Sequence, residues 1–230
     1  MKQKKELLSF LLLMIMLGLS SCDWLNPNKE ITDPSKTMGK VGNYWTATVP
    51  DAPDAKITIN SNSNGNVIAT IPYNGVNYEV EGKITDNGFS DYVYSNGDKS
   101  KPYTLVKFDA NVGDKWEYKI GNQTVTREVV KKSTTDDTSY GFWLVKTIDV
   151  LETVPAGLMI NGAVGQLKSG TIFMPDNNVS QTKSMYGNVS QVKTILWKFN
   201  HKFGFIAAEI TKTDNTKVIV SQIDTNVATL

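Results

Sequence analysis

The sequence predicts an all-β fold: an antiparallel sandwich, or a full or half barrel, with short strands joined by hairpins. Three observations predict it. Apolar and polar residues alternate with a period of two over several segments, as expected of half-buried antiparallel strands. Dipeptides that favour turns, such as Asn-Gly, fall between these segments. Beyond the amino terminus, no window carries the i, i+3, i+4, i+7 apolar stripe of an amphipathic helix.

The amino terminus has the architecture of a secretory signal. Three of the first five residues are lysines, residues 7–19 are almost wholly apolar, and small residues precede Cys22. A transmembrane helix needs roughly 20 apolar residues, so this shorter run favours a cleaved signal over a membrane span. We therefore expect residues 1–21 to be a signal peptide.

Leu19-Ser20-Ser21-Cys22 resembles the lipobox of bacterial lipoproteins. The resemblance implies that Cys22, the single cysteine of the chain, is lipidated and becomes the acylated amino terminus. Stable anchoring needs more than one acyl chain, and lipoprotein triacylation supplies it. Residues 22–38, which include Pro27 and Pro34, are expected to link the anchor to the folded part. The expected location is the cell envelope, with the outer membrane or cell surface favoured and the leaflet left open.

Three hairpins are predicted along the chain. In each, two alternating runs flank a dipeptide that favours a tight turn. The runs and turns are 67–73 and 76–84 around Asn74-Gly75, 116–120 and 125–130 around Gly121-Asn122, and 203–210 and 217–223 around Asp214-Asn215. Further turns are predicted at Asn64-Gly65, Asn87-Gly88, Asn96-Gly97 and Asn161-Gly162.

One short motif occurs twice. Val41-Gly42-Asn43-Tyr44-Trp45 recurs as Val112-Gly113-Asp114-Lys115-Trp116. In both copies Gly would permit a tight turn, and Trp would begin a strand by filling the core. Because the residues that follow do not align, we expect a single β domain over residues 39–230. The alternative is two β halves, 39–105 and 106–230.

The order of motifs in the second half resembles that of uncharacterised Bacteroidetes-type lipoproteins with a Val-Gly-Asp-x-Trp signature. The motifs are residues 112–118, Val154-Pro155-Ala156-Gly157, and Trp197-Lys198-Phe199 followed by residues 203–206. The resemblance covers roughly the second half of the mature chain. It implies an envelope β-protein and carries no catalytic residues with it.

The composition excludes several classes of function. The chain has 24 Lys and Arg against 23 Asp and Glu, without a basic block, so it lacks the charge pattern of a nucleic-acid-binding protein. One Cys and one His exclude a cysteine-rich zinc site. No dinucleotide-binding, P-loop or zinc-protease motif is present. We expect no cofactor, no metal and no nucleic-acid partner.

The aromatic residues are the first candidates for a binding site. Most should fill the core, but Tyr92, Tyr94 and Tyr103 lie near the turn-rich segment 86–102. Because loops carry function more often than strands do, these three rings are the best candidates for ligand contact, as part of an exposed platform on which sugar rings could stack.

Paired carboxylates are the candidates for catalysis. Glu79 and Glu81 share one face of a predicted strand, as the acid and base of a glycoside hydrolase would, although a solvated sheet face has the same pattern. His201 could act as a base, but the sequence supplies no nucleophile motif to accompany it. We therefore expect a non-enzymatic binding or structural module for a glycan, a lipid or a partner protein. The alternative is a secreted hydrolase.

Overall fold

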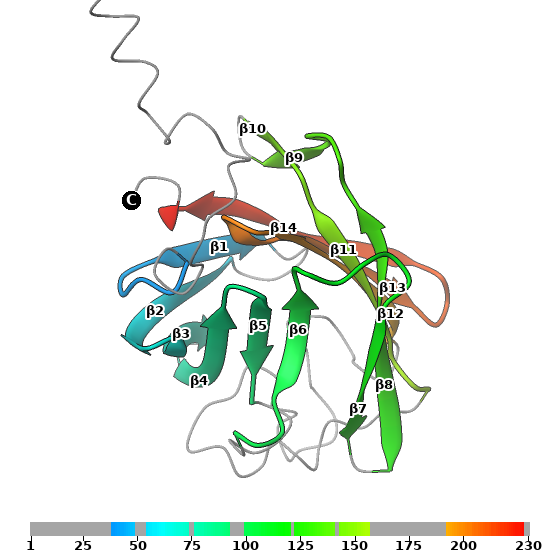
Figure 1. Cartoon of the computed structure of the whole chain (residues 1–230), viewed down its shortest axis with the longest axis horizontal. Helices are drawn as coiled ribbons and strands as arrows, with labels where there is room; N and C mark the ends of the chain where they lie inside the picture. Colours follow the sequence, from blue (N-terminus) through cyan, green and yellow to red (C-terminus); the bar gives the residue numbers. More distant parts are fainter. Residues whose placement is uncertain are drawn as a thin grey trace, which may run out of the picture.

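The structure, a computed structural model, describes residues 38–48, 54–73, 76–92, 99–120, 122–140, 143–156 and 192–227. Its main feature is one twelve-stranded antiparallel sheet, which curves until its two edges nearly meet (Figure 1). The predicted all-β antiparallel fold is confirmed, and it takes the form of a nearly closed barrel.

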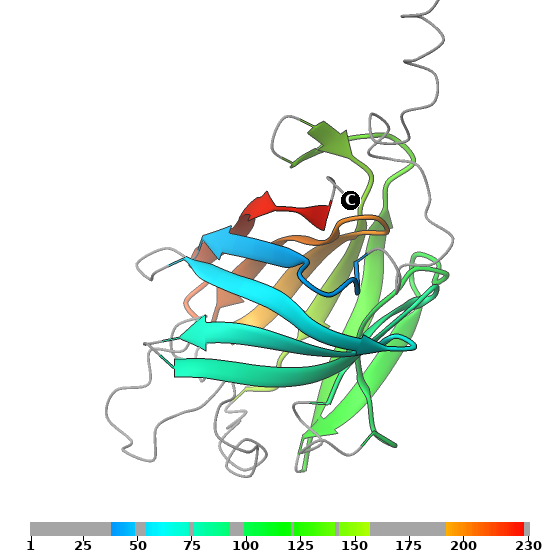
Figure 2. The ribbon, with the colours of Figure 1, turned by 90° about the vertical axis from the view of Figure 1, so that its left-hand side faces the viewer.

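The strands follow one another around the barrel in a simple order. That order is β6 (Tyr103–Lys107), β5 (Gly88–Asp91), β4 (Val76–Thr85), β3 (Asn66–Tyr73), β2 (Ala55–Ser63), β1 (Tyr44–Thr48), β14 (Lys217–Thr225), β13 (Gly204–Lys212), β12 (Val192–Asn200), β11 (Ile148–Thr153), β8 (Gln123–Lys132) and β7 (Lys115–Ile120). A separate hairpin, β9 (Thr138–Tyr140) and β10 (Trp143–Val145), connects β8 to β11. Figure 2 shows the barrel from the side of β1 to β4, with β8 and β11 behind them.

The three predicted hairpins are all present. Their closing pairs are Tyr73 with Val76, Ile120 with Gln123, and Thr211 with Lys217. The predicted turn at Asn64-Gly65 also joins two strands, and both of its residues have positive φ angles, 51° and 82°, as a type I′ turn requires. Asn87-Gly88 lies in the hairpin between β4 and β5. The turns predicted at Asn96-Gly97 and Asn161-Gly162 lie outside the described residues.

Alternate residues of each strand point into the barrel. In β4, Ile84 is buried and Val80 packs against the core, whereas Glu79 and Glu81 point outward and are exposed. The same parity places Val125 and Val129 of β8 inside. Burial of these apolar side chains, at roughly 25 cal/mol per Å² of apolar surface, is the main force that holds the sheet in its curved form.

The repeated motif forms the same turn twice. The amide of Asn43 donates to the carbonyl of Lys40 at 3.0 Å, and that of Asp114 donates to the carbonyl of Asn111 at 3.1 Å. The glycines inside these turns, Gly42 and Gly113, have φ angles of 88° and 95°, a conformation that favours glycine. Both turns lead directly into a strand, as the sequence predicted.

The two copies of the motif open two meanders of the same sheet. The first meander is β1 to β6, and the second is β7, β8 and β11 to β14. They meet at two junctions. At one junction β1 pairs with β14 through the backbone. At the other, which we call the seam, lie the two sheet edges β6 and β7. The two halves are therefore parts of one sheet.

Side chains rather than backbone pairing close the seam. The indole Nε1 of Trp116 and the hydroxyl of Tyr118 both donate to the carbonyl oxygen of Thr104, at 2.9 and 2.6 Å. The guanidinium of Arg127 donates to the carbonyl oxygen of Leu105. These side chains donate hydrogen bonds to carbonyls of the edge strand β6, in place of the backbone amides of a neighbouring strand.

Candidate ligand site at the barrel mouth

One end of the barrel, which we call the mouth, gathers segments that lie far apart in the sequence. The alternating strand directions place there the entry segment 38–43 and the connections 64–65, 86–87, 108–114, 133–147 and 200–203. Hydrogen bonds link them to one another. The amide of Phe108 donates to the carbonyl of Asn87 at 2.7 Å, and the side chain of Asn200 donates to the carbonyl of Lys146 at 2.8 Å.

A pocket of about 470 Å³ opens among these connections. Its floor is apolar and is formed by Phe108, Ile148 and Phe199, which also pack in the barrel core. Its rim carries both charges, with side chains that include Asp86, Asp109, Lys132, Lys146, His201 and Lys202. Sites for small ligands commonly occupy roughly 300–1,000 Å³ and combine an apolar lining with a few polar groups. The mouth pocket has this size and this distribution of groups.

The turn between β12 and β13 presents His201 to the pocket. Asn200, which is buried, shapes the turn, because its Oδ1 accepts hydrogen bonds from the amides of Lys202 and Phe203 at 2.7 and 3.0 Å. The imidazole of His201 then packs edge-on against the ring of Phe108, with 4.9 Å between their centroids. The single histidine of the chain is thus part of the pocket wall, in the turn between two strands.

Two hydroxyl groups line the same pocket, and each donates its hydrogen bond to a neighbouring carboxylate. Ser133 donates to Asp137 at 2.8 Å, and Thr147 donates to Asp149 at 2.7 Å. A serine nucleophile would instead direct its proton to a base such as His201. This arrangement suits a wall that orients a ligand through hydrogen bonds.

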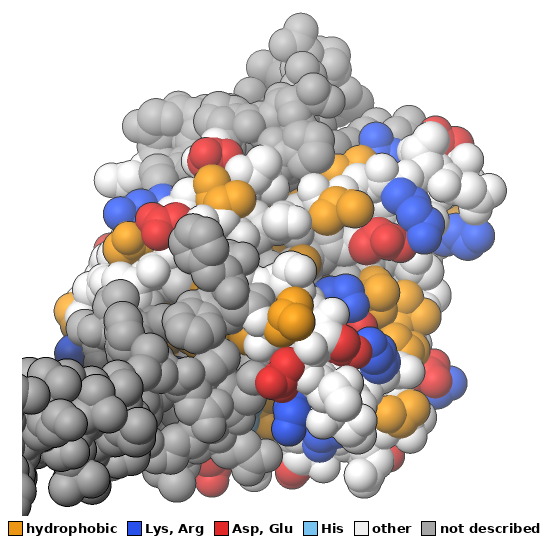
Figure 3. Space-filling model, turned by 90° about the horizontal axis from the view of Figure 1, so that it is seen from above, with side chains coloured by type: hydrophobic (Ala, Val, Ile, Leu, Met, Phe, Trp, Pro, Cys, Tyr) orange, Lys and Arg blue, Asp and Glu red, His pale blue; other side chains and the backbone are white. Residues whose placement is uncertain are grey.

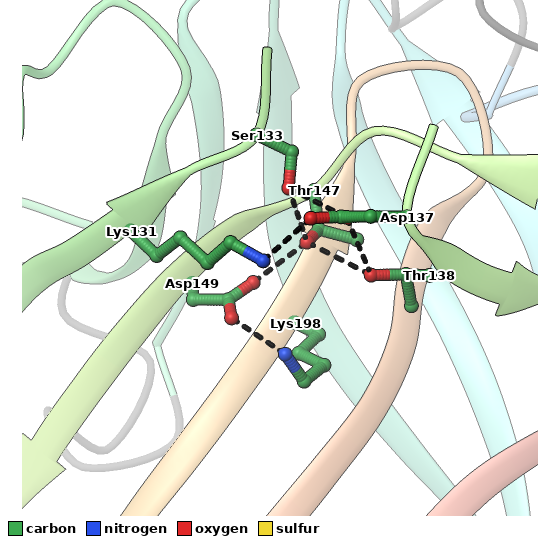
Figure 4. A network of polar contacts seen from close by, with 7 residues as sticks. All are labelled: Lys131, Ser133, Asp137, Thr138, Thr147, Asp149 and Lys198. Atoms are coloured by element: carbon green, nitrogen blue, oxygen red, sulfur yellow. Dashed lines mark hydrogen bonds and ion pairs between the residues drawn. The ribbon is translucent and has the colours of Figure 1, made fainter. Parts of the chain in front are cut away.

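A polar network fastens the β9–β10 hairpin to the barrel beside the pocket (Figure 4). Lys131 reaches Asp137 at 2.6 Å, and Lys198 reaches the buried Asp149 at 2.5 Å. Thr147 links the two carboxylates. Its hydroxyl donates to Asp149 and lies 3.5 Å from the hydroxyl of Ser133, which donates to Asp137. Hydrogen bonds from Lys131 and Ser133 lower the pKa of Asp137 to about 2, so this carboxylate stays ionised at neutral pH.

A second polar group lies inside the barrel. Arg127 is fully buried and pairs with the carboxylate of Glu152, which also accepts a hydrogen bond from the indole of Trp197 at 3.0 Å. The guanidinium lies over the rings of Tyr103 and Trp197, 4.9 and 5.4 Å from their centroids. Burial, the largest single effect, lowers the pKa of Arg127, but the charge and hydrogen bond of Glu152 together with the electrostatic effects of Tyr103 and Tyr118 outweigh it and raise the pKa overall. The guanidinium therefore stays charged.

An apolar layer separates this ion pair from the mouth pocket. The layer contains Val106, Val129 and Val150, which are completely buried. Arg127 instead connects Glu152, on one side of the interior, to the carbonyl of Leu105 at the seam. Its position therefore serves the closure of the barrel.

The sequence contained a signal for this ion pair that our reading missed. Arg127 is the single arginine of the chain, and it occupies the inward parity of β8 between Val125 and Val129. A charged residue at an apolar position of a strand calls for a buried partner. The sequence did not identify that partner, because Glu152 lies 25 residues away.

The tyrosines predicted to form a sugar platform lie elsewhere. Tyr92 and Tyr103 are both buried, so they form no exposed platform. Tyr103 points inward at the seam, where its ring lies 4.1 Å from that of Tyr118. Tyr94 lies outside the described residues. A contact between any of the three and a ligand stays a prediction.

The carboxylates proposed for a hydrolase lie on the outer face of β4. Glu79 and Glu81 are exposed, and Glu81 forms an ion pair with Lys99 at 3.0 Å. Neither lines the mouth pocket. The alternation that suggested a pair of catalytic acids is therefore explained by the solvated face of an antiparallel sheet.

The remaining expectations concern the anchor and metals. Cys22 and its linker lie outside the described residues. Within the described ranges, no helical segment has the length and hydropathy needed to span a bilayer. The same ranges contain no cluster of three or more His, Cys, Asp or Glu side chains arranged to hold a metal ion.

Comparisons of the chain with protein-family models, with curated proteins and with solved structures find no match. The geometry of the barrel and its mouth therefore carries the functional argument.

Proposed function

We propose that this chain is a lipid-anchored protein of the cell envelope that binds a small ligand at the mouth of its barrel without catalysing a reaction. The observation that carries the proposal is the pocket of about 470 Å³, which has an apolar floor and a rim with both charges. The hydroxyls of Ser133 and Thr147 support a binding role, since both donate to carboxylates.

The pocket chemistry favours a ligand with two kinds of surface. Phe108, Ile148 and Phe199 offer apolar contact, and Lys146 and Lys202 offer charge at the rim. A lipid with a polar head or a glycan with an apolar ring face matches this combination. These are the two small-molecule classes expected from the sequence.

The anchor follows from the lipobox-like residues before Cys22. We expect Cys22→Ser to move the protein from the membrane fraction to the soluble fraction, because the acyl chains supply the membrane affinity. Cell fractionation measures this directly. Retention of the variant in the membrane fraction would contradict the anchor.

Ligand binding is tested by a thermal-shift screen of the mature domain against soluble glycans, fatty acids and divalent cations. A ligand at 100 times its dissociation constant should stabilise the fold by about 2.7 kcal/mol. We expect a glycan or a fatty acid to raise Tm, and Lys146→Glu at the rim to reduce that shift. The matched control is Lys119→Glu, an exposed lysine near the opposite end of the barrel. A screen without any response would contradict the binding role.

A further inference from the structure

We propose that the mouth of the barrel docks on the surface of the bilayer that holds the lipid on Cys22. This inference rests on the anchor in the proposed function and adds to it a protein surface that contacts lipid. Two independent features lead to it: where the chain enters the barrel, and where apolar side chains are exposed.

The chain enters the barrel at the mouth and is fixed there. Met38, the first described residue, is fully buried in a cluster with Phe203 and Val227. Its carbonyl accepts a hydrogen bond from the side chain of Asn43 at 3.0 Å, and the next carbonyl, of Gly39, accepts one from Asn62 at 2.8 Å. The linker from the anchor therefore begins at a firm point on the mouth.

The linker is short in comparison with the barrel. From Cys22 to Met38 the chain runs 38 − 22 = 16 residues. A flexible chain of that length spans about 22 Å on average. A strand of 9 residues such as β13 is about 30 Å long. Because the chain joins the barrel at the mouth, the mouth lies on average nearer to the anchor than the opposite end does.

Exposed apolar side chains gather at the same end. Val41 and Val112, at equivalent positions of the repeated turn, are 55% and 59% exposed, and Leu144 of β10 is 54% exposed. Val130 and Ile223 are also exposed, each two residues from the mouth end of its strand. Among the large apolar side chains exposed in the described ranges, Ile219 is the one that lies near the opposite end. Scattered exposed apolar side chains need no explanation, but five of these six lie at one end, which indicates a surface that contacts an apolar phase.

The charges of the mouth nearly balance, which argues for contact with the lipid itself rather than with an anionic headgroup layer. The pocket lining includes three lysines, Lys132, Lys146 and Lys202, and two aspartates, Asp86 and Asp109. Figure 3, which views the molecule from the side of the β9–β10 hairpin, shows the same mixture of apolar, basic and acidic side chains. Docking should therefore depend on the exposed valines more than on the surface charge of the membrane. In this orientation the mouth pocket opens towards the bilayer.

Site-specific quenching tests the orientation. The natural cysteine carries the lipid in the proposed mature protein, so an introduced cysteine is the single free thiol. The full-length protein, processed in bacteria, is labelled at Val41→Cys or Val112→Cys with an environment-sensitive fluorophore and reconstituted into phosphatidylcholine vesicles that contain doxyl-labelled lipid. The controls are Thr124→Cys and Thr213→Cys, which are exposed near the opposite end.

We expect labels at the mouth to be quenched at least twofold more than labels at the opposite end. In a label placed at Val41→Cys, adding Val112→Asp should reduce this quenching, because a carboxylate opposes insertion into lipid. Equal quenching at both ends, in protein that floats with the vesicles, would overturn the docking and leave the anchor intact. Failure of the full-length protein to float would overturn the anchor, and with it the docking.

Discussion

The two junctions between the halves of the barrel are closed in different ways. At the first, β1 pairs with β14 along a backbone ladder from Trp45 to Thr48. At the seam, Trp116, Tyr118 and Arg127 hydrogen-bond to the carbonyls of β6 with their side chains. Both junctions begin from the same turn motif, so the difference arises from the side chains that follow the motif.

One position concentrates that difference. Trp45 pairs with Ile57 on the neighbouring strand, and Trp116 pairs with Arg127. In the first half, closure requires no polar side chain at Ile57, because backbone pairing of β1 with β14 already closes that junction. In the second half an arginine, held by Glu152, reaches the open edge. The comparison teaches that a buried ion pair can replace a strand ladder where a barrel does not close fully.

The largest expected effect comes from removing the charge at the seam. We expect Arg127→Met to destabilise the domain by about 3–5 kcal/mol, because it leaves the carboxylate of Glu152 buried without its counter-charge. Urea unfolding measures this loss. The matched control is Ile57→Met, at the equivalent position of the first half, which should cost less than about 1.5 kcal/mol.

A double variant sharpens the same prediction. Arg127→Met combined with Glu152→Met should be more stable than Arg127→Met alone, because it removes the unpaired charge. If the double variant were no more stable than the single one, the carboxylate would not be the source of the cost. The seam would then depend on Arg127 through its packing and its bond to Leu105.

Replacing each of the two tryptophans by Phe should show whether its junction affects the stability of the seam alone or of the whole barrel. The indole of Trp45 donates to the carbonyl of Phe203 at 2.7 Å, and that of Trp116 donates to Thr104 at 2.9 Å. Trp45→Phe should cost about 2 kcal/mol, because it removes the bond and the indole donor of the Phe203 carbonyl. Trp116→Phe should cost about 1 kcal/mol, because Tyr118 still donates to the carbonyl of Thr104. Hydrogen exchange should then rise mainly in β6 and β7 for Trp116→Phe. It should rise throughout the barrel for Trp45→Phe, and the same pattern in both variants would contradict a distinct seam.

The glycines of the repeated turn should behave alike. Gly42→Ala and Gly113→Ala each force a side chain into a left-handed conformation, although a Cβ would meet no atom within 4 Å at either site. We expect each to cost about 1 kcal/mol through backbone strain. Equal shifts of the urea midpoint would support equivalent turns, and a cost at one site only would contradict the equivalence.

The smallest expected effect concerns alkaline pH. Burial raises the pKa of Tyr118 at the seam and raises that of Tyr140 at the mouth to about 12. The unfolded chain, whose phenol pKa values lie near 10, releases these protons first. Stability should therefore be unaffected below pH 10 and fall as the pH rises from 10 towards 12. Tyr118→Phe should make this decline shallower, and an unchanged slope would contradict the burial of that phenol.

The sequence predicted the parts of the fold that local rules determine. Asn74-Gly75 and Gly121-Asn122 joined the strands they were expected to join, because turn geometry and period-two alternation act over a few residues. The closure of the barrel was beyond those rules. Nothing local to Trp116 indicates that its indole meets Thr104 across the seam.

The site was harder to predict for the same reason. His201, Asn87 and Lys146 line one pocket but come from three separate connections. Tyr92 and Tyr103, two of the three tyrosines predicted from their turn-rich surroundings, are buried, and Tyr103 begins a strand and points inward at the seam. Proximity to turns does not determine which face of a sheet a ring occupies.

The central claim is that the mouth pocket binds the ligand of this protein. Its most direct test is amide chemical-shift mapping by NMR of the mature domain, titrated with the glycan or fatty acid that gives the largest thermal shift. We expect changes centred on Asn87, Thr147 and His201, with little change at Asn122 and Asn215 at the opposite end. Changes centred away from the mouth would contradict it.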